Sequence, residues 1–178
     1  MTSASTIERV VTPRLLCERL QATDGEELFQ LLLDPRVAET LWPGAEPPMA
    51  QDVLDSLRVN MEHWERHGFG MWLARDRMSG EMVGRGGLQF TYSVDLNEIE
   101  AGWAIVPERW GHGLATEIAW ASIEAAFGPL DLLNIVALAL PHNRASRRVM
   151  EKTGFAYERD VIHAGLPHVL YRRSRDRD

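Results

Sequence analysis

A short glycine-containing segment from Gly111 to Thr116 has the composition of an anion-binding site. We expect it to connect a strand that stops at Pro107 to a helix that begins at about Leu114. The first N–H groups of a helix lack partners within the helix, and the helix dipole adds partial positive charge there. Glycine also lets a ligand approach the main chain closely. The segment therefore favours a phosphate or pyrophosphate, although a lone Gly-x-Gly pair is more often only a turn.

Other motifs of this kind do not suggest a site. The sequence contains no Gly-x-x-x-x-Gly-Lys-Ser/Thr segment, which excludes a P-loop. The glycines of Gly84–Gly87 lie inside an expected strand and do not open a helix, so we interpret them as a bent or bulged strand. His63 and His67 have the i, i+4 spacing of a metal pair on a helix. Since no third ligand accompanies them, we interpret them as a solvated face and predict no metal.

The elements that must position these residues are helices and strands in mixed order. Apolar residues at helical spacing predict helices over residues 24–34, 50–66, 114–127 and 143–153. Short apolar or alternating runs predict strands over residues 15–20, 71–75, 82–90, 98–106, 132–140, 155–162 and 168–173.

Candidate caps and a polar face can be assigned to three of the predicted helices. Thr23 is a candidate N-cap for the first helix, which Pro35 ends, and Asn143 is a candidate N-cap for the last one. The helix over 114–127 is apolar almost all round, and Glu117 and Glu124 are seven residues apart on what we expect to be its one wet face.

Length and composition indicate an ordinary globular protein. The 178 residues suit one domain, residues 1–178, with residues 1–11 and 174–178 as frayed ends. The chain shows neither a secretory signal nor the roughly 20 apolar residues of a membrane span, so we expect no membrane association. Cys17 is the only cysteine, which favours a reducing cytoplasm. The net charge of −7 disfavours nucleic acid and fits a cationic partner such as an amine.

Five segments, in order along most of the chain, resemble the GNAT superfamily of N-acetyltransferases and its RimJ/RimL branch. They are Thr12–Leu16, Met82–Leu88, Glu98–Trp103, Trp110–Glu117 and Asn143–Phe155. The resemblance implies the α/β (mixed α+β) GNAT fold, with a mostly antiparallel central sheet splayed after its fourth strand and about four flanking helices. One departure is visible, because Trp110 stands where the family's pyrophosphate loop usually begins with Gln or Arg.

The same resemblance implies acetyl-CoA as the acyl donor and no metal. The backbone of Ala104, Ile105 and Val106 would pair with the pantetheine arm, and the Ile105 amide would lie near the thioester carbonyl, where oxyanion charge develops. The remaining donor-binding positions implied by the family are Gly111, His112, Gly113, Leu114, Ala115, Thr116, Asn143 and Ser146.

Two roles in proton transfer, the base and the proton donor, have candidate residues. Several relatives carry a base at the position of Glu100, and strand alternation places Glu98 and Glu100 on one face. Glu98 and Asp95 are rivals, and any of the three carboxylates is open to interpretation as an exposed strand-edge residue. Met150 stands where many members have a tyrosine, so Ser146 is our candidate proton donor to the leaving thiolate. A hydroxyl that only hydrogen-bonds the donor is an equal alternative for Ser146.

The predicted function is acetyl transfer from acetyl-CoA directly to an amine, either a small molecule or a protein N-terminus, with help from a carboxylate or water. An acyl-CoA-binding sensor or adaptor without efficient turnover is the alternative. An unrelated nucleotide-binding α/β domain is a third hypothesis, which the missing phosphate motifs disfavour. The sequence leaves open the acceptor, the restriction to acetyl groups, and whether the protein forms a homodimer.

Overall fold

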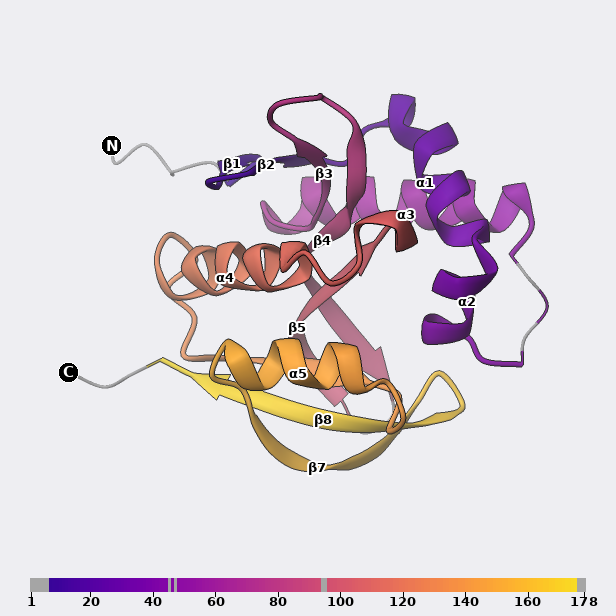
Figure 1. Ribbon diagram of the computed structural model, residues 1–178. Helices are drawn as coiled ribbons and strands as arrows, with labels where there is room; N and C mark the ends of the chain where they lie inside the picture. Colours follow the sequence, from indigo (N-terminus) through magenta and orange to yellow (C-terminus); the bar gives the residue numbers. More distant parts are fainter. Residues whose placement is uncertain (1–6, 45, 47, 94–95, 176–178) are drawn as a thin grey trace.

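Eight strands form one sheet in the computed structural model, which describes residues 7–44, 46, 48–93 and 96–175. The strands are β1 (Arg9–Val11), β2 (Leu15–Arg19), β3 (Met71–Asp76), β4 (Met82–Ser93), β5 (Leu96–Ile105), β6 (Asn134–Ala139), β7 (Ala156–His163) and β8 (Leu166–Ser174). Their order across the sheet is β1-β2-β3-β4-β5-β6-β8-β7 (Figure 1). Neighbours are antiparallel except for β5 and β6, which run parallel.

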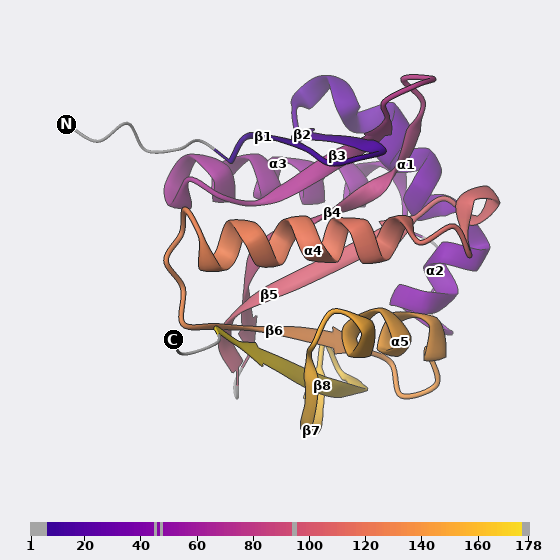
Figure 2. The same ribbon diagram turned by 60° about the vertical axis from the view of Figure 1, so that its left-hand side comes forward.

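Five α-helices cover this sheet within the described residues: α1 (Gly25–Leu33), α2 (Pro35–Leu41), α3 (Ala50–His67), α4 (Leu114–Phe127) and α5 (Arg144–Lys152). Leu28 of α1 and Val53 of α3 pack with Leu73 of β3 in one apolar cluster. Ile118 of α4 packs with Leu88 of β4 in another, so α4 lies on the opposite face (Figure 2). None of the helices in the described residues is long and apolar enough to cross a membrane.

The sheet is splayed where its two parallel strands meet. β5 pairs with β6 at a single position, Glu100 opposite Val136, whereas β6 stays paired with β8 along its whole length. Arg172 of β8 closes the near end, because its guanidinium bonds Glu98 of β5 at 2.8 and 3.2 Å. Beyond Glu100 the two strands diverge toward their carboxyl ends (Figure 2). The expected splay after the fourth strand of the family's sheet is thus confirmed.

The described part of the chain has one more α-helix than the four or so that we expected. Pro35 ends α1 as expected, but it also occupies the first turn of α2, where a missing N–H costs nothing. Asp34 caps that helix by accepting a hydrogen bond from the Arg36 amide at 2.9 Å. The proposed cap at Thr23 is wrong, since Thr23 lies in a 3₁₀ turn and Asp24 is the N-cap residue of α1.

The expected frayed ends are partly ordered. Arg9–Val11 form β1 and pair with β2. Ser174 ends β8, and the Arg175 guanidinium bonds the Asp131 carboxylate at 2.7 Å. The rest of the predicted frayed ends, residues 1–6 and 176–178, lies outside the described residues.

The glycine-rich part of β4 fits the predicted irregular strand. The register between β3 and β4 shifts at Ala74 and Arg75. Gly86 faces α4, and a Cβ there would lie 2.4 Å from a methyl group of Ile118. Glycine at this position therefore lets α4 pack directly on the sheet.

We expected His63 to lie on a solvated face of its helix. In the structure both nitrogens of its ring instead contact backbone groups. Its Nδ1 lies 2.8 Å from the Phe69 carbonyl oxygen, and its Nε2 accepts the Phe90 amide at 3.1 Å. These contacts require a neutral ring with the proton on Nδ1. Burial is the main reason why the pKa of His63 is lowered, with the charges of His67 and Arg66 acting in the same direction. Within the described residues, no three His, Cys, Asp or Glu side chains gather as a metal site.

We expect the contribution of His63 to stability to be complete above its unfolded-state pKa of about 6.5 and to be lost as the pH falls below it. Protonation of Nε2 removes the acceptor of the Phe90 amide. His63→Phe should lower the unfolding free energy at pH 7.5 by about 1–3 kcal/mol and flatten its dependence on pH between 7.5 and 5. Urea unfolding at each pH measures both effects. His67→Phe is the control and should keep the wild-type slope; an equal slope in His63→Phe would contradict the assignment.

Candidate active site

A cavity of about 630 Å³ opens where β5 and β6 diverge. Its walls come from β4, β5 and β6, from α2, from the N-terminal end of α4, from α5, and from the β7–β8 hairpin. The cavity brings together most of the residues expected from sequence: Glu100, Ala104, Ile105, Gly111, Gly113, Leu114, Ala115, Thr116, Asn143 and Ser146.

Two expected donor-binding residues lie outside the lining of this cavity. The Val106 amide donates to the Val83 carbonyl at 2.9 Å, so this residue turns toward β4, and its side chain packs against an apolar cluster that contains Val37. His112 is exposed, and its carbonyl oxygen accepts a hydrogen bond from Arg14 Nη1 at 2.7 Å.

The loop before α4 has the geometry of an anion site. Gly111 and Gly113 both have φ of 78°, in the left-handed region that favours glycine. The Glu117 amide makes the first helical bond, to the Gly113 carbonyl at 3.1 Å. The amides of Leu114, Ala115 and Thr116 therefore lack helical partners and lie beside the cavity. This arrangement fits the pyrophosphate of a donor such as acetyl-CoA.

Trp110 braces this loop against the end of β5. Its indole Nε1–H donates to the Ile105 carbonyl at 2.7 Å, while 44% of the residue remains exposed. Because Val106 bonds toward β4, strand alternation turns the Ile105 amide and carbonyl toward the opening. A carbonyl oxygen has two lone pairs, so one acceptor position on Ile105 remains for a ligand. The tryptophan at the family's Gln/Arg position thus serves as a brace.

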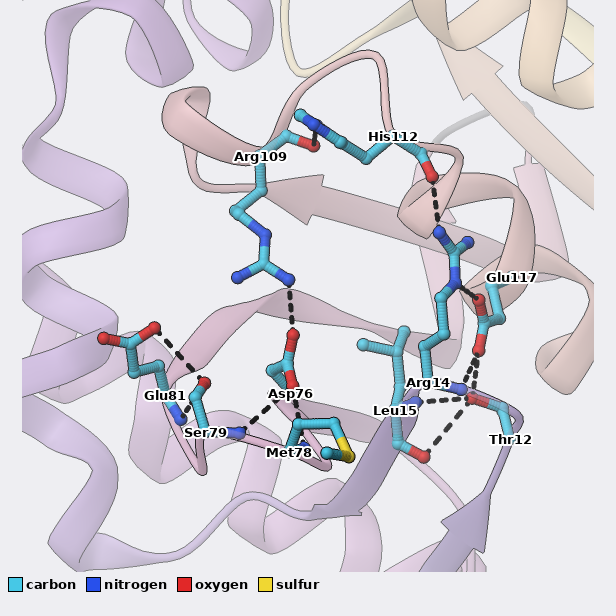
Figure 3. A network of polar contacts seen from close by, with 10 residues as sticks. All are labelled: Thr12, Arg14, Leu15, Asp76, Met78, Ser79, Glu81, Arg109, His112 and Glu117. Carbon is cyan, nitrogen blue, oxygen red and sulfur yellow. Dashed lines mark hydrogen bonds and ion pairs between the residues drawn. The ribbon is translucent and has the colours of Figure 1, made fainter.

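Glu117 is the centre of a second brace (Figure 3). Its carboxylate accepts hydrogen bonds from Thr12 Oγ1 at 2.5 Å, from the Arg14 amide at 2.8 Å and from Arg14 Nε at 2.7 Å. Burial raises the pKa of Glu117, but these hydrogen bonds outweigh it and hold the pKa below its usual value. Only 12% of the side chain is exposed, so the prediction that Glu117 lies on a solvent-exposed helix face is wrong. Because Arg14 also bonds the His112 carbonyl, the start of β2 fixes the loop.

A third brace holds the segment between β5 and the loop. Arg109 Nη2 lies 2.5 Å from the Asp76 carboxylate, which also accepts the Met78 and Ser79 amides at 2.8 and 3.2 Å (Figure 3). The turn between β3 and β4 is therefore tied to the 3₁₀ turn Pro107–Arg109. Sequence inspection missed this pair, since nothing in the local pattern joins two residues that are 33 positions apart.

Glu100 is the one acidic side chain among the described residues that line the cavity. It lies across from Gln89 on β4, at the point where β5 leaves β6. Burial raises its pKa to about 7, opposed by a hydrogen bond from Gln89 and by the charge of Arg85. Its rival Glu98 is bonded to Arg172 outside the lining, and Asp95 lies outside the described residues.

The N-terminal end of α5 places Asn143 and Ser146 in the cavity wall. Asn143 is the N-cap, and its Oδ1 accepts the Ser146 amide at 3.1 Å, as the sequence predicts. The Ser146 hydroxyl makes no hydrogen bond within the described part of the protein, so it is available to a ligand. Met150 is 1% exposed and belongs to the core.

Several cavity residues were not expected from sequence. They are polar or charged side chains from elements far apart in the chain: Thr40, Arg85, Gln89, Arg109, Arg148, Lys152, His163 and His168. One available signal was Arg85, a large cation inside a run of glycines, which we interpreted through its glycine neighbours alone.

We expect Glu117→Gln to weaken acetyl-CoA binding about tenfold, because a neutral amide cannot accept all three bonds and the loop loses its fixed position. The unfolding free energy should fall by about 1–3 kcal/mol for the same reason. Calorimetric titration and urea unfolding measure the two effects. Glu124→Gln, on an exposed position of the same helix, should change neither. Equal affinities in the two variants would show that the network does not position the loop.

Comparison with known proteins agrees with this geometry. Residues 14–156 match the model of a family described as the acetyltransferase (GNAT) domain. The chain is 27% identical over 165 residues to the uncharacterized protein YkkB of Bacillus subtilis strain 168, covering 93% of this chain and 95% of that one. A solved putative GnaT-family acetyltransferase from Bordetella pertussis superposes with a TM-score of 0.82 and 26% identity, over 93% and 99% of the two chains.

A more distant structure shows the fold alone. RimL, described as a ribosomal L7/L12 α-N-protein acetyltransferase in complex with coenzyme A, superposes with a TM-score of 0.73 at 18% identity, covering 93% of this chain and 96% of that one. The family match covers most of the present chain, including the strand of Glu100 and the loop before α4. The chain therefore belongs to the GNAT family, as an acetyl-CoA-dependent N-acetyltransferase.

Proposed function

We propose that this protein transfers the acetyl group of acetyl-CoA directly to the amine of a small molecule or a protein N-terminus, with Glu100 as general base. The observation that carries the proposal is the position of Glu100. Among the described residues it is the one carboxyl group in the cavity wall, and it stands where the two parallel strands part.

The acceptor needs a base because an alkyl ammonium group with a pKa of about 10 holds its proton at neutral pH. Glu100 has a pKa of about 7, so near neutrality a large fraction of it is ionised and able to take that proton, directly or through water. The freed amine nitrogen then attacks the thioester carbonyl carbon. A bond from nitrogen to carbon forms, the carbon–sulfur bond breaks, and the nitrogen loses a second proton as it becomes an amide.

The donor would lie along the opened edge of β5. Pairing with the backbone groups of Ile105 that face the opening would hold its arm, and the Ile105 amide would stabilise the oxyanion. The unpaired amides at the start of α4 would bind the pyrophosphate. Arg109, Arg148 and Lys152 also line the cavity, and their charges favour the donor's phosphates.

The leaving thiolate takes a proton at the end of the reaction, and the second proton lost by the nitrogen restores the group that donated it. Ser146 is the donor that we propose, because its hydroxyl lines the cavity and is free within the described structure. The competing role is a hydrogen bond that only holds acetyl-CoA. The two roles affect different kinetic constants.

Glu100→Gln should reduce kcat by about 10²–10⁴. In the wild type, kcat/KM should rise with pH through about 7 and then level off, because the base of the free enzyme must be ionised; activity is lost as the pH falls below the raised pKa. The variant should lack this rise of activity with pH. Release of free thiol from acetyl-CoA with a panel of amines and N-terminal peptides provides the measurement.

Glu98→Gln is the matched control for that experiment, since Glu98 is bonded to Arg172 outside the cavity wall. Glu98→Gln should retain the rise of activity with pH through about 7. An unchanged kcat for Glu100→Gln at every pH would end the assignment of the base. If calorimetry shows acetyl-CoA binding and no amine releases thiol, the protein is an acyl-CoA sensor or adaptor instead.

Ser146→Ala should lower kcat while leaving the KM for acetyl-CoA near its wild-type value, if Ser146 donates the proton. The reverse pattern, an unchanged kcat with a raised KM, identifies a hydroxyl that only binds the donor. Steady-state kinetics with acetyl-CoA as the varied substrate separates the two. Ser122→Ala is the control, because that buried hydroxyl donates to the Ile118 carbonyl at 3.0 Å within α4 and should affect neither constant.

A further inference from the structure

The cavity of this acidic protein has a basic wall. Four cationic side chains line it, Arg85, Arg109, Arg148 and Lys152, against Glu100 as the one acidic side chain of the described lining. Three of the cations belong to the 3₁₀ turn before the loop or to α5. Arg85 comes from β4, in the middle of the sheet.

Arg85 lies on the other face of the sheet from the anion-binding loop. Gly86 faces α4, and strand alternation turns Arg85 and Gln89 away from that helix. Their cross-strand partners, Ala104 and Glu100, share this face. Ala104 packs there with Val37 of α2. Arg85, Gln89 and Glu100 therefore belong to the acceptor side of the cavity.

The guanidinium of Arg85 has no protein partner in the described structure: it forms no ion pair and no hydrogen bond there. Burial lowers the pKa of Arg85, and the charge of Glu100 only partly opposes this. Glu100 is not a full counter-ion, since its own pKa of about 7 leaves it partly protonated. A half-buried guanidinium with five donors is costly unless an acceptor reaches it, and a carboxylate fits its planar fork with two parallel bonds.

The same cations oppose acceptors that carry many amines. A polyamine or an aminoglycoside would bring several positive charges against Arg85, with a single carboxyl group to receive them. One amine beside Glu100 and one anion on Arg85 balance the charges of this wall. On β4, Arg85 is four positions from Gln89, the partner of Glu100, which is about 13 Å of strand. The long arginine side chain spans part of this separation.

We propose, resting on the acetyltransferase function above, that the acceptor is a small amine that carries a carboxylate in the same molecule, held by Arg85 while Glu100 takes the proton from its amine. An amino acid or a short ω-amino acid has this chemistry. A protein N-terminus lacks the α-carboxylate, because its first carbonyl is an amide, and only an Asp or Glu as first residue brings a carboxylate this close to the amine. Arg85 is then a specificity-determining residue.

The experiment compares ω-amino acids of increasing length with their own carboxamides, since the distant amine keeps nearly the same pKa in each pair. The wild type should favour the best acid over its amide at least tenfold in kcat/KM. Arg85→Gln should bring that ratio close to one, and Arg85→Lys should keep part of it. Arg148→Gln is the matched control on the donor side; it should raise the KM for acetyl-CoA and leave the ratio unchanged.

A second readout does not need turnover. Acids should raise the Tm of the CoA-saturated protein, amides should not, and Arg85→Gln should lose the effect; its far-UV circular dichroism must match the wild type. The inference is overturned if amides or N-terminal peptides are preferred, if Arg85→Gln keeps the acid preference, or if no acid is acetylated or raises the Tm. Thiol release with simple alkylamines alone would leave the proposed function standing, whereas no release with any amine contradicts that function.

Discussion

The site depends on one break in the backbone pairing of the sheet. β5 and β6 run parallel, and in the described residues their backbones pair only where Glu100 faces Val136. On one side of this point Arg172 holds the sheet closed through Glu98. On the other side the backbone of β5 is left without a neighbouring strand, which is energetically unfavourable unless a ligand or water takes the strand's place. The cavity, the free edge at Ile105 and the position of Glu100 all follow from this break.

The loop that closes one end of the opening is held by contacts from three directions. Trp110 ties it to the Ile105 carbonyl, Glu117 to the start of β2, and Arg109 to the turn that contains Asp76. A helix N-terminus offers strong anion binding only when its amides stay oriented, so these braces prepare the loop before a ligand arrives. Together with the isolated charge of Arg85, they give the two faces of the sheet different chemistry.

Local patterns predicted the elements well where both ends are marked. The helix over 114–127 has the predicted bounds because Gly113 precedes it and Gly128 follows it. α2 escaped prediction because Pro35 is both a stop signal and a good first residue of a helix. The sequence order also located the loop, the Glu100 strand and Asn143, since the family's motifs are local in the chain.

Long-range contacts escaped prediction for a different reason. Helical spacing placed Glu117 in water, yet its partners Thr12 and Arg14 lie more than 100 residues earlier in the chain. The isolation of Arg85 is visible only once β4, β5 and α2 are placed around it. Such features depend on which elements meet across the sheet, and no spacing within one segment reports that.

The single cysteine has a practical consequence. Cys17 lies in β2 with none of its surface exposed, and burial, helped by the charge of Glu117, raises its pKa to about 12. Its sulfur therefore stays protonated and shielded from solvent near neutral pH. Thiol reagents react only with the ionised form, because the thiolate is the nucleophile. Coenzyme A set free by each turnover is then the sole reactive sulfhydryl in the mixture. A colorimetric disulfide reagent can follow the reaction continuously without consuming the enzyme.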